Sequence, residues 1–134
     1  MVIILDTNIL IDLAHHQKDV VGALNDVLNE NPAITVINKY EFLRGVLISN
    51  GIKEKKEKQI SFLNQFEVYD FTSNTVQHCT EVYSRLRENG RLINELDILI
   101  LGICVENRVS LITNDHDFDE MGQITGIDIK VLNY

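Results

Sequence analysis

The sequence predicts an α/β fold of three layers (α/β/α), in which helices cover both faces of a mainly parallel central sheet. Short aliphatic runs typical of buried strands alternate along the chain with longer segments whose apolar residues recur at helical spacing. No proline-rich or serine-rich linker and no repeat interrupts this alternation over the 134 residues. We therefore expect one domain that spans residues 1–134.

The chain begins with a strand that leads directly into a helix. Residues 2–5 form an aliphatic run typical of a buried strand, and the run stops abruptly at a polar residue. Thr7 and Asn8 are good capping residues and are expected to start a helix that covers residues 9–14. A second helix is expected over residues 19–29, where apolar residues fall on one face at helical spacing.

The middle of the chain is expected to hold a strand between two helices. Asn31-Pro32 should end the preceding helix, because proline cannot continue it. The β-branched residues that follow predict a strand over residues 33–37, and Asn38 is expected to cap the next helix, with Glu41 in its first turn. The lysine-rich segment 52–66 is interpreted as a helix with a solvated polar face.

The remaining elements continue the alternation. Residues 67–71 are expected to form a strand, followed by a helix from Ser73 to Asn89-Gly90, where glycine suits the left-handed terminating position. The most hydrophobic helix is expected over residues 94–108, and its nearly uniform apolar character predicts a central position. Two further strands are expected over residues 109–113 and 127–132.

The composition excludes several classes of protein. The longest uninterrupted apolar stretch, residues 98–105, is far shorter than the ~18 residues of a membrane-spanning helix. The hydrophobic beginning of the chain is interrupted by Asp6 and Asp12, and no basic region precedes it. We therefore expect a cytoplasmic protein without a membrane segment. Cys79 and Cys104 have no second Cys or His at ligand spacing, so buried free thiols are expected.

The chain is acidic, with 12 Lys and Arg against 20 Asp and Glu and a formal net charge of −8. This balance argues against a broad basic surface that would hold nucleic acid without regard to its sequence. Any interaction with nucleic acid must therefore depend on a local site.

Four acidic residues from four elements are expected at one edge of the sheet. Asp6 directly follows the first strand, Asp115 follows a later strand by one residue, and Glu41 and Asp97 lie in the first turns of helices. In parallel sheets, ligands bind outside the carboxyl ends of the strands. Clustered carboxylates repel each other unless a cation or protons neutralise them. Oxygen ligands suit Mg²⁺ or Mn²⁺, and no His or Cys cluster points to zinc.

Each acid also has an ordinary structural interpretation. Asp6 could simply end a strand, Asp97 could complement a helix macrodipole, and Asp115 with Asp117 could form an Asx turn. Their joint placement on one sheet edge favours the metal site over these separate explanations.

The sequence around these acids resembles the motifs of PIN-domain nucleases. Residues 2–12 (VIILDTNILID) resemble the opening motif of that family, and residues 40–45 (YEFLRG) resemble the second. The third and fourth motifs are matched by residues 95–100 (ELDILI) and 111–118 (LITNDHDF). A short chain with these motifs in this order is most similar to the VapC-type toxins of toxin–antitoxin pairs. The family usually has two alanines near Leu101-Gly102, and only the glycine is small here.

The resemblance implies a metal-dependent endoribonuclease that hydrolyses RNA phosphodiester bonds without a side-chain nucleophile. Asp6, Glu41, Asp97 and Asp115 would then form the catalytic site and hold one or two Mg²⁺ or Mn²⁺ ions. Asp6 and Asp97 would be direct ligands, Asp115 a ligand directly or through water, and Glu41 either a ligand or the group that orients the attacking water. The resemblance also implies an RNA substrate, a cognate VapB-type antitoxin and a homodimer.

Further polar residues are candidates for supporting this site. Thr7 and Asn8 either cap the first helix or hold the Asp6 carboxylate by hydrogen bonds. Thr113 and Asp117 have the same two interpretations, and for Asp117 a supporting or turn-forming role is favoured over a direct one. His116 is expected to face solvent.

Basic residues near the acids are candidates for RNA contacts. Lys39 and Arg44 flank Glu41, and Arg44 could contact a phosphate or pair with a carboxylate, of which pairing is favoured. The run Lys53–Lys58 is interpreted as a solvated helix face, and it is also the densest positive patch available for RNA. A second patch of this kind would consist of Arg85, Arg87 and Arg91.

Two alternatives belong to other functional classes. An aspartate-nucleophile phosphatase also places an aspartate after a strand, but it needs a second aspartate two residues later, where this chain has Asn8. A non-catalytic PIN-fold module that binds RNA or protein is the other alternative. The presence of all four acids argues against it.

Overall fold

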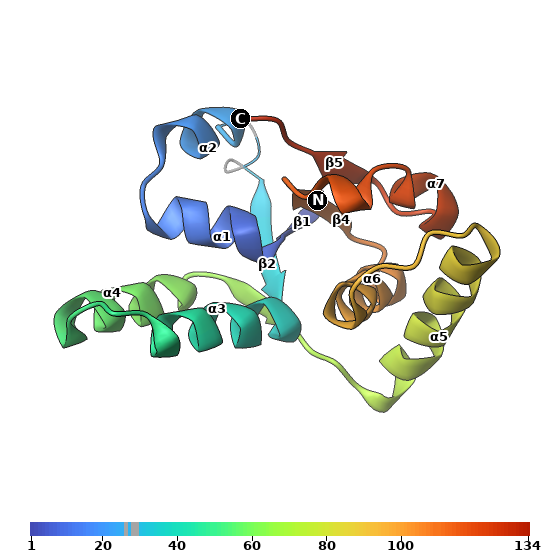
Figure 1. Cartoon of the computed structure of the whole chain (residues 1–134), viewed down its shortest axis with the longest axis horizontal. Coiled ribbons are helices and arrows are strands. Elements are labelled where there is room, and N and C mark those ends of the chain that lie inside the picture. The colour runs from blue at the N-terminus through green and yellow to red at the C-terminus, as the bar shows by residue number, and fades with distance from the viewer. Residues whose placement is uncertain (26, 28–29) are drawn as a thin grey trace.

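The computed structural model describes residues 1–25, 27 and 30–134, and a five-stranded parallel sheet lies at their centre (Figure 1). The strands lie in the order β3-β2-β1-β4-β5, and all paired neighbours run parallel. They are β1 (Val2–Leu5), β2 (Asn31–Thr35), β3 (Glu67–Tyr69), β4 (Ser110–Thr113) and β5 (Ile129–Val131). The predicted α/β class is confirmed, and the described sheet is parallel throughout.

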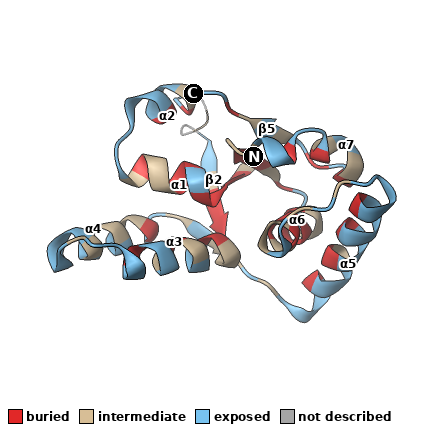
Figure 2. Cartoon of the chain, in the orientation of Figure 1, coloured by how far each residue is buried: buried red, intermediate tan, exposed pale blue. Residues whose placement is uncertain are grey.

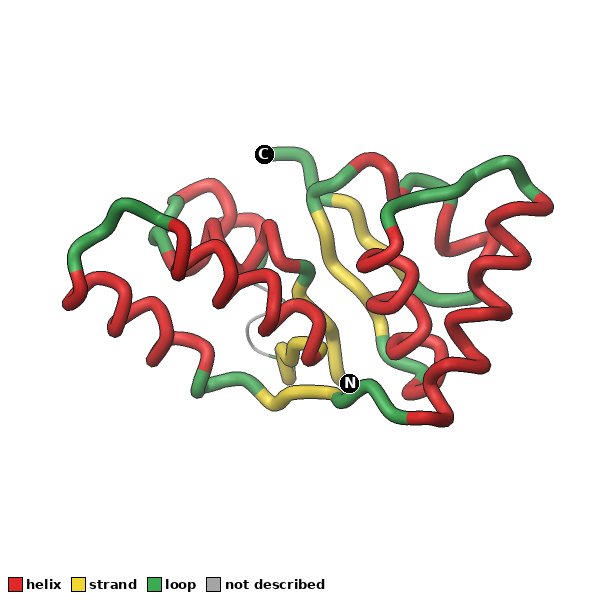
Figure 3. The backbone as a smooth tube through the Cα atoms, turned by 60° about the horizontal axis from the view of Figure 1, so that its bottom comes forward, coloured by secondary structure: helices red, strands yellow, loops and turns green. Residues whose placement is uncertain are grey.

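Helices pack on both faces of this sheet, as Figures 1 and 3 show. One face is covered by α1 (Thr7–Ala14), α2 (Lys18–Ala23), α3 (Val36–Ile48) and α4 (Lys53–Leu63). The other face is covered by α5 (Ser73–Glu88), α6 (Glu95–Asn107), the 3₁₀ turn η1 (His116–Phe118) and α7 (Met121–Thr125). This is the predicted three-layer arrangement. Among the described helices, none combines the length and the apolar character needed to span a membrane.

The strands alternate their side chains between two hydrophobic clusters. In β1, Val2 and Ile4 pack with the cluster under α5 and α6, whereas Ile3 and Leu5 pack with the cluster under α1 to α4. Ile4 and Leu5 are completely buried. Figure 2 shows the same pattern, with burial concentrated in the sheet and on the helix faces turned toward it. Burial on both faces explains why β1 is an uninterrupted aliphatic run.

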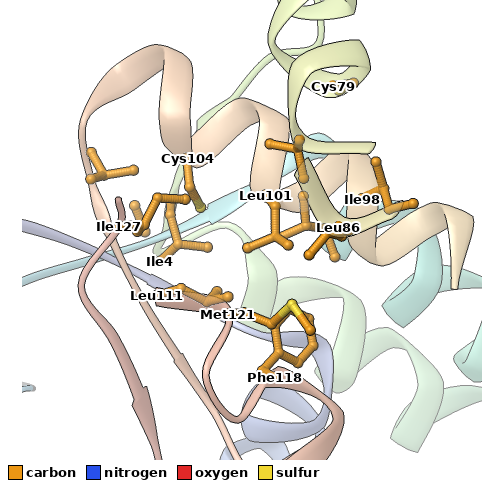
Figure 4. Packing of buried hydrophobic residues seen from close by; sticks show 14 residues of the cluster. Ile4, Cys79, Leu86, Ile98, Leu101, Cys104, Leu111, Phe118, Met121 and Ile127 are labelled. Carbon is orange, nitrogen blue, oxygen red and sulfur yellow. The ribbon is translucent and has the colours of Figure 1, made fainter. Parts of the chain in front are cut away.

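Helix α6 is central, as its composition predicts. Leu101 and Cys104 are completely buried and face Ile4 and Leu111 of the sheet (Figure 4). Cys79 of α5 and Cys104 are both buried free cysteines, which confirms the expectation for these thiols. Burial of α6 on several sides explains its lack of a polar face.

The predicted boundary between the second strand and the third helix is wrong. β2 covers Asn31–Thr35 and α3 begins at Val36, so the last residues of the predicted strand 33–37 are helical. Thr35, not Asn38, caps α3. The hydroxyl of Thr35 accepts a hydrogen bond from the Asn38 N–H, and the Asn38 side chain accepts one from the Thr35 N–H. This capping box overrides the β-branched character of residues 34–37.

The predicted caps of the first helix are also wrong. Asp6 is the N-cap of α1, and Thr7 and Asn8 are already helical. Asp6 is as good a capping residue as threonine or asparagine, so sequence preference could not decide among the three.

Other boundaries differ more modestly. α2 begins one residue early, at Lys18, and ends at Ala23; positions 26, 28 and 29 of the helix predicted over 19–29 lie outside the described residues. Pro32 lies inside β2 near its beginning, where a proline is tolerated. Both β3 and β5 are shorter than predicted, and η1 and α7 were not predicted. The segment Met121–Thr125 is short and lies between two left-handed residues, Glu120 and Gly126, so it has no detectable periodicity.

Candidate active site

The carboxyl ends of three neighbouring strands meet at one edge of the sheet. Leu5 of β1 is in register with Ile112 of β4, and Ile4 is in register with Ala33 of β2. β2 and β3 lie on one side of β1, and β4 and β5 lie on the other, so β1 and β4 flank the point where the strand order reverses. Such a switch point is where open parallel sheets bind ligands.

Asp6 lies at this switch point and is held from several directions. Its N–H donates to the Ile112 carbonyl at 2.9 Å, and its Oδ1 accepts from the Thr7 N–H at 2.8 Å. Its Oδ2 accepts from the Thr113 hydroxyl at 2.7 Å. Asp6 and Thr113 continue the alternation that places Ile4 and Leu111 on the α6 face, so both side chains point to that face. The Asp6 residue is only 4% exposed.

Asn38 is a site residue that the sequence did not reveal. Its side-chain amide donates to Thr7 Oγ1 at 3.0 Å and lies 3.5 Å from Asp6 Oδ1, and the residue is fully buried. The amide therefore links the first turns of α1 and α3, which follow the neighbouring strands β1 and β2. The spacing Thr35-x-x-Asn38 was the available signal, because a capping box puts the third helical residue next to the strand end.

Glu41 joins the site through Thr7. The Thr7 hydroxyl donates to Glu41 Oε1 at 2.7 Å, so the Thr7 side chain orients Glu41, while its backbone N–H holds Asp6. The earlier start of α3 puts Glu41 in the second turn of that helix, which corrects its predicted place in the first turn. Glu41 still lies near the sheet edge, because Asn38 and Glu41 are neighbours on one helix face.

Asp115 approaches the site from the loop after β4. Its N–H donates to Thr113 Oγ1 at 3.1 Å, and its carboxylate accepts from the Asp117 N–H at 2.9 Å. Thr113 therefore contacts both Asp6 and the backbone of Asp115. Asp117 is exposed and its N–H closes the turn, which agrees with its interpretation as a turn-forming residue.

Asp97 completes the group from the opposite helical layer. It lies in the first turn of α6, as predicted, and is half-buried. The pKa of Asp97 is raised to about 7, chiefly by burial and also by the negative charges of Asp6, Glu41 and Asp115. Burial also raises the pKa of Asp6, although the hydrogen bonds from Thr113 and Thr7 oppose this shift. The fold thus brings the four predicted acids near enough for the charges of Asp6, Glu41 and Asp115 to act on Asp97.

The donor set fits a hard divalent cation. Carboxylate oxygens are the ligands that Mg²⁺ and Mn²⁺ prefer, and a cation would relieve the repulsion that raises the pKa of Asp97. In the part of the chain that the structure describes, however, no three His, Cys, Asp or Glu side chains stand close enough to form a ready ligand cluster. A cation would therefore have to draw these side chains together or use water as additional ligands.

The other candidate residues lie around this group. Asn8 is exposed, and no hydrogen bond joins it to Asp6 within the described residues. Lys39 and Arg44 are exposed on α3. Arg44 has no carboxylate within ion-pair distance in the described structure and lies 5.1 Å above the ring of Tyr40, so the expected pairing is wrong. His116 is exposed, as expected, with Nδ1 3.0 Å from a carboxylate oxygen of Asp119.

The basic patches predicted for RNA are partly paired. Lys53 lies 3.9 Å from Glu57 on α4, Arg85 pairs with Glu81 at 2.6 Å on α5, and Arg91 pairs with Glu120 at 2.7 Å. These ion pairs reduce the positive charge that the two patches present to a phosphate.

Comparisons of sequence and of structure both relate this chain to PIN-domain and VapBC proteins. The PIN domain family model matches residues 3–124. The curated protein Ribonuclease VapC2 of Rickettsia felis is 26% identical over 117 residues, which cover 86% of this chain and 87% of that protein. The crystal structure of Rickettsia felis VapBC2 bound to a promoter DNA fragment contains a similar chain, with a TM-score of 0.84, 24% identity and coverage of 99% and 100%. A structure of VapBC-5, a member of the VapBC family of toxin–antitoxin systems from Mycobacterium tuberculosis, gives a TM-score of 0.74, 19% identity and 98% coverage of both chains.

Proposed function

Because this chain belongs to the PIN domain family, we propose that it is a divalent-metal-dependent endoribonuclease and the toxin of a toxin–antitoxin pair. The observation that carries this proposal is the convergence of Asp6, Glu41, Asp97 and Asp115 from four elements onto one sheet edge. Burial and, to a smaller extent, the neighbouring carboxylates raise the pKa of Asp97, as is common at functional sites. The similarity to Ribonuclease VapC2 supports RNA as the substrate.

The four carboxylates have different proposed roles. Asp6 and Asp97 would bind the cation directly, Asp115 directly or through water, and Glu41 as a ligand or as the group that orients the attacking water. Bound there, Mg²⁺ or Mn²⁺ would supply a water of lowered pKa and positive charge for the phosphate oxygens. The Thr7 hydroxyl holds one oxygen of Glu41, and both oxygens of Asp6 accept hydrogen bonds, from the Thr7 N–H and the Thr113 hydroxyl. These contacts fix the orientation of the two carboxylates toward a cation.

The proposed partners follow from the relatives. VapBC-5 is a member of a family of toxin–antitoxin systems, so we infer that a VapB-type antitoxin binds this chain. The homodimer is proposed from the resemblance to VapC-type toxins alone. An RNA substrate would place the protein in the cytoplasm. Co-purification with the product of a small neighbouring gene would test the antitoxin, and sedimentation of the isolated chain would test the dimer.

The nuclease proposal can be tested by incubating the purified chain with total cellular RNA and mapping new 5′ ends by sequencing. We expect cleavage at defined positions with Mn²⁺ or Mg²⁺, none with EDTA, and none by Asp6→Asn. The matched control is Asp128→Asn, since Asp128 is an exposed carboxylate before β5, at the opposite edge of the sheet.

Three outcomes would contradict the proposal. Cleavage in the presence of EDTA would show that the reaction needs no divalent cation. Full activity of Asp6→Asn would show that Asp6 is not a ligand of that cation. RNA binding without cleavage in either cation would instead favour a non-catalytic PIN-fold module. For the toxin role, expression should arrest growth, and the Asp6→Asn variant should relieve the arrest.

A further inference from the structure

An exposed tyrosine and an arginine that has no ion pair within the described residues lie together on the helix that carries Glu41. Tyr40 is 53% exposed on α3, and the guanidinium carbon of Arg44 lies 5.1 Å from the centre of its ring. We propose that the Tyr40–Arg44 pair binds an unpaired base of single-stranded RNA and its adjacent phosphate, next to the bond that is cut. This inference rests on the proposed nuclease function and names how its substrate is held.

The pair has a fixed position relative to the acids. Tyr40 directly precedes Glu41, and Arg44 follows Glu41 by three residues, so Arg44 lies one helical turn from Glu41 on a neighbouring part of the helix surface. Glu41 in turn accepts a hydrogen bond from Thr7, the residue that also holds Asp6. A nucleotide on the pair would therefore lie on the same helix as Glu41 and next to it.

Charge favours RNA as the occupant of this surface. Arg85 and Arg91 are paired with carboxylates, but within the described residues neither Arg44 nor Lys39 has a carboxylate at ion-pair distance. The guanidinium lies over the ring, and no hydrogen bond from its N–H donors is found within the described residues, so these donors can bind a phosphate. In a chain of net charge −8, these two cations beside an acidic site are a local exception.

The chemistry of the pair matches unpaired bases better than duplex RNA. Proteins read single-stranded RNA by stacking splayed bases on aromatic rings and on arginine planes, whereas an RNA duplex hides these base faces. Tyr40 is 53% exposed as a residue, which leaves room for such a base beside the guanidinium. The competing explanation is that the pair only stabilises α3 through an i,i+4 contact, which would give no preference for bases over bare phosphates.

The test compares two labelled oligomers with equal numbers of phosphates, a short oligoadenylate and the corresponding abasic ribose oligomer. Binding is measured by fluorescence anisotropy with Mg²⁺ in an Asp6→Asn background, so that the oligoadenylate is not cut. We expect the parent to prefer the oligoadenylate by about tenfold, the size of effect that one stacked base gives. Tyr40→Leu should reduce this preference to about twofold or less, and Tyr40→Phe should keep it, because the ring is retained.

Two further variants make the result decisive. Tyr83→Leu removes a similarly exposed tyrosine, 37% exposed on α5, and should leave the preference unchanged. Arg44→Gln should weaken binding of both oligomers, because the phosphate contact is lost, and gives an independent measurement if Tyr40→Leu does not fold. A preference that survives Tyr40→Leu, equal losses in Tyr40→Leu and Tyr83→Leu, or no binding of oligoadenylate by the parent would each overturn the inference. Because binding is measured without cleavage, these outcomes leave the cleavage test of the nuclease proposal independent.

Discussion

Among the site residues, Asp97 carries a negative charge that the folded chain disfavours at neutral pH. Its pKa is raised to about 7, from an ordinary value of 3.8, chiefly by burial and then by the neighbouring carboxylates. Between these two values the folded state holds a proton that the unfolded state releases. The free energy of unfolding of the cation-free protein therefore falls as pH rises from about 4 to about 7.

Asp97→Asn should accordingly stabilise the cation-free protein at about pH 8 and have little effect at about pH 4. We expect a gain of ~1–2 kcal/mol at the higher pH, because water screens part of the repulsion at a half-buried carboxyl. Urea unfolding of both chains in EDTA at the two pH values measures this difference. An equal difference at both values would show that Asp97 does not titrate in this range. Asp97→Asn should also abolish RNA cleavage, because it removes a proposed ligand of the cation.

Thr113 controls the protonation of Asp6. Its hydroxyl donates to Asp6 Oδ2, and this hydrogen bond lowers a pKa that burial otherwise raises. Thr113→Val removes the donor, so the pKa of Asp6 should rise and the charged form should be reached only at higher pH. We expect the cleavage rate near neutral pH to fall about tenfold. The acid limb of the pH–rate profile should move to higher pH.

The control for that prediction is Thr125→Val, which removes a buried hydroxyl that donates to the Met121 carbonyl away from the acids. It should lower stability without moving the pH–rate profile. If Thr113→Val lowered the rate equally at every pH, its role would be confined to holding the loop that carries Asp115.

Residue types predicted the acids of the site and two residues that hold them, Thr7 and Thr113, but not Asn38. Asp6, Glu41, Asp97 and Asp115 are recognisable because carboxylates rarely follow several buried elements of one sheet. Asn38 was taken as a helix cap, since asparagine is common there, and its contact with Thr7 depends on the starting residue of α3. Such a contact depends on packing between elements that are distant in the sequence, which local preference does not contain.

At the scale of secondary structure, α5 and α6 approach each other closely at Gly102. A Cβ atom at this position would lie 2.1 Å from Cys79 Sγ and 3.1 Å from the Cys79 Cα. The glycine is therefore required by helix packing and not by backbone conformation, which explains why a small residue occurs at this point of the motif.

Gly102→Ala should destabilise the chain by ~1–3 kcal/mol, because the helices must separate or Cys79 must change its position. The double variant Gly102→Ala with Cys79→Ala should recover part of this loss, since the sulfur is removed while the backbone of residue 79 stays close. Urea unfolding of the two single variants and the double variant measures the coupling. Strictly additive losses would show that the two helices adjust independently at this point.

The alternation of elements was predictable, and the errors fall where two local preferences compete. The buried strand β1 and the apolar helix α6 were predicted because burial on both faces leaves a clear pattern in the sequence. At Thr35, β-branched residues favour a strand while the capping box favours a helix, and the helix begins. The short helix α7 left no pattern, because five residues are too few for a period to be detected.

For the whole molecule, the net charge of −8 predicts how RNA binding depends on salt. Two bound divalent cations would halve this charge and concentrate the change at the acids. With one or two phosphates contacted by Arg44 and Lys39, the logarithm of RNA affinity should fall with the logarithm of KCl with a slope of about −0.7 to −1.4. Anisotropy titrations at several KCl concentrations and constant Mg²⁺ measure this slope. A much steeper slope would reveal a wider basic surface than the structure shows.

The strand order has a consequence for the synthesis of the protein. Asp6 is fixed by Thr113, and its own strand is paired with β4, although these residues are 107 positions apart in the chain. A nascent chain that has emerged only as far as α5 therefore contains Asp6 and Glu41 but neither Asp97 nor the hydroxyl that orients Asp6. We therefore expect the proposed nuclease to be unable to cut RNA while its own chain is still being synthesised. Fragments from prematurely terminated translation should likewise be harmless to the cell.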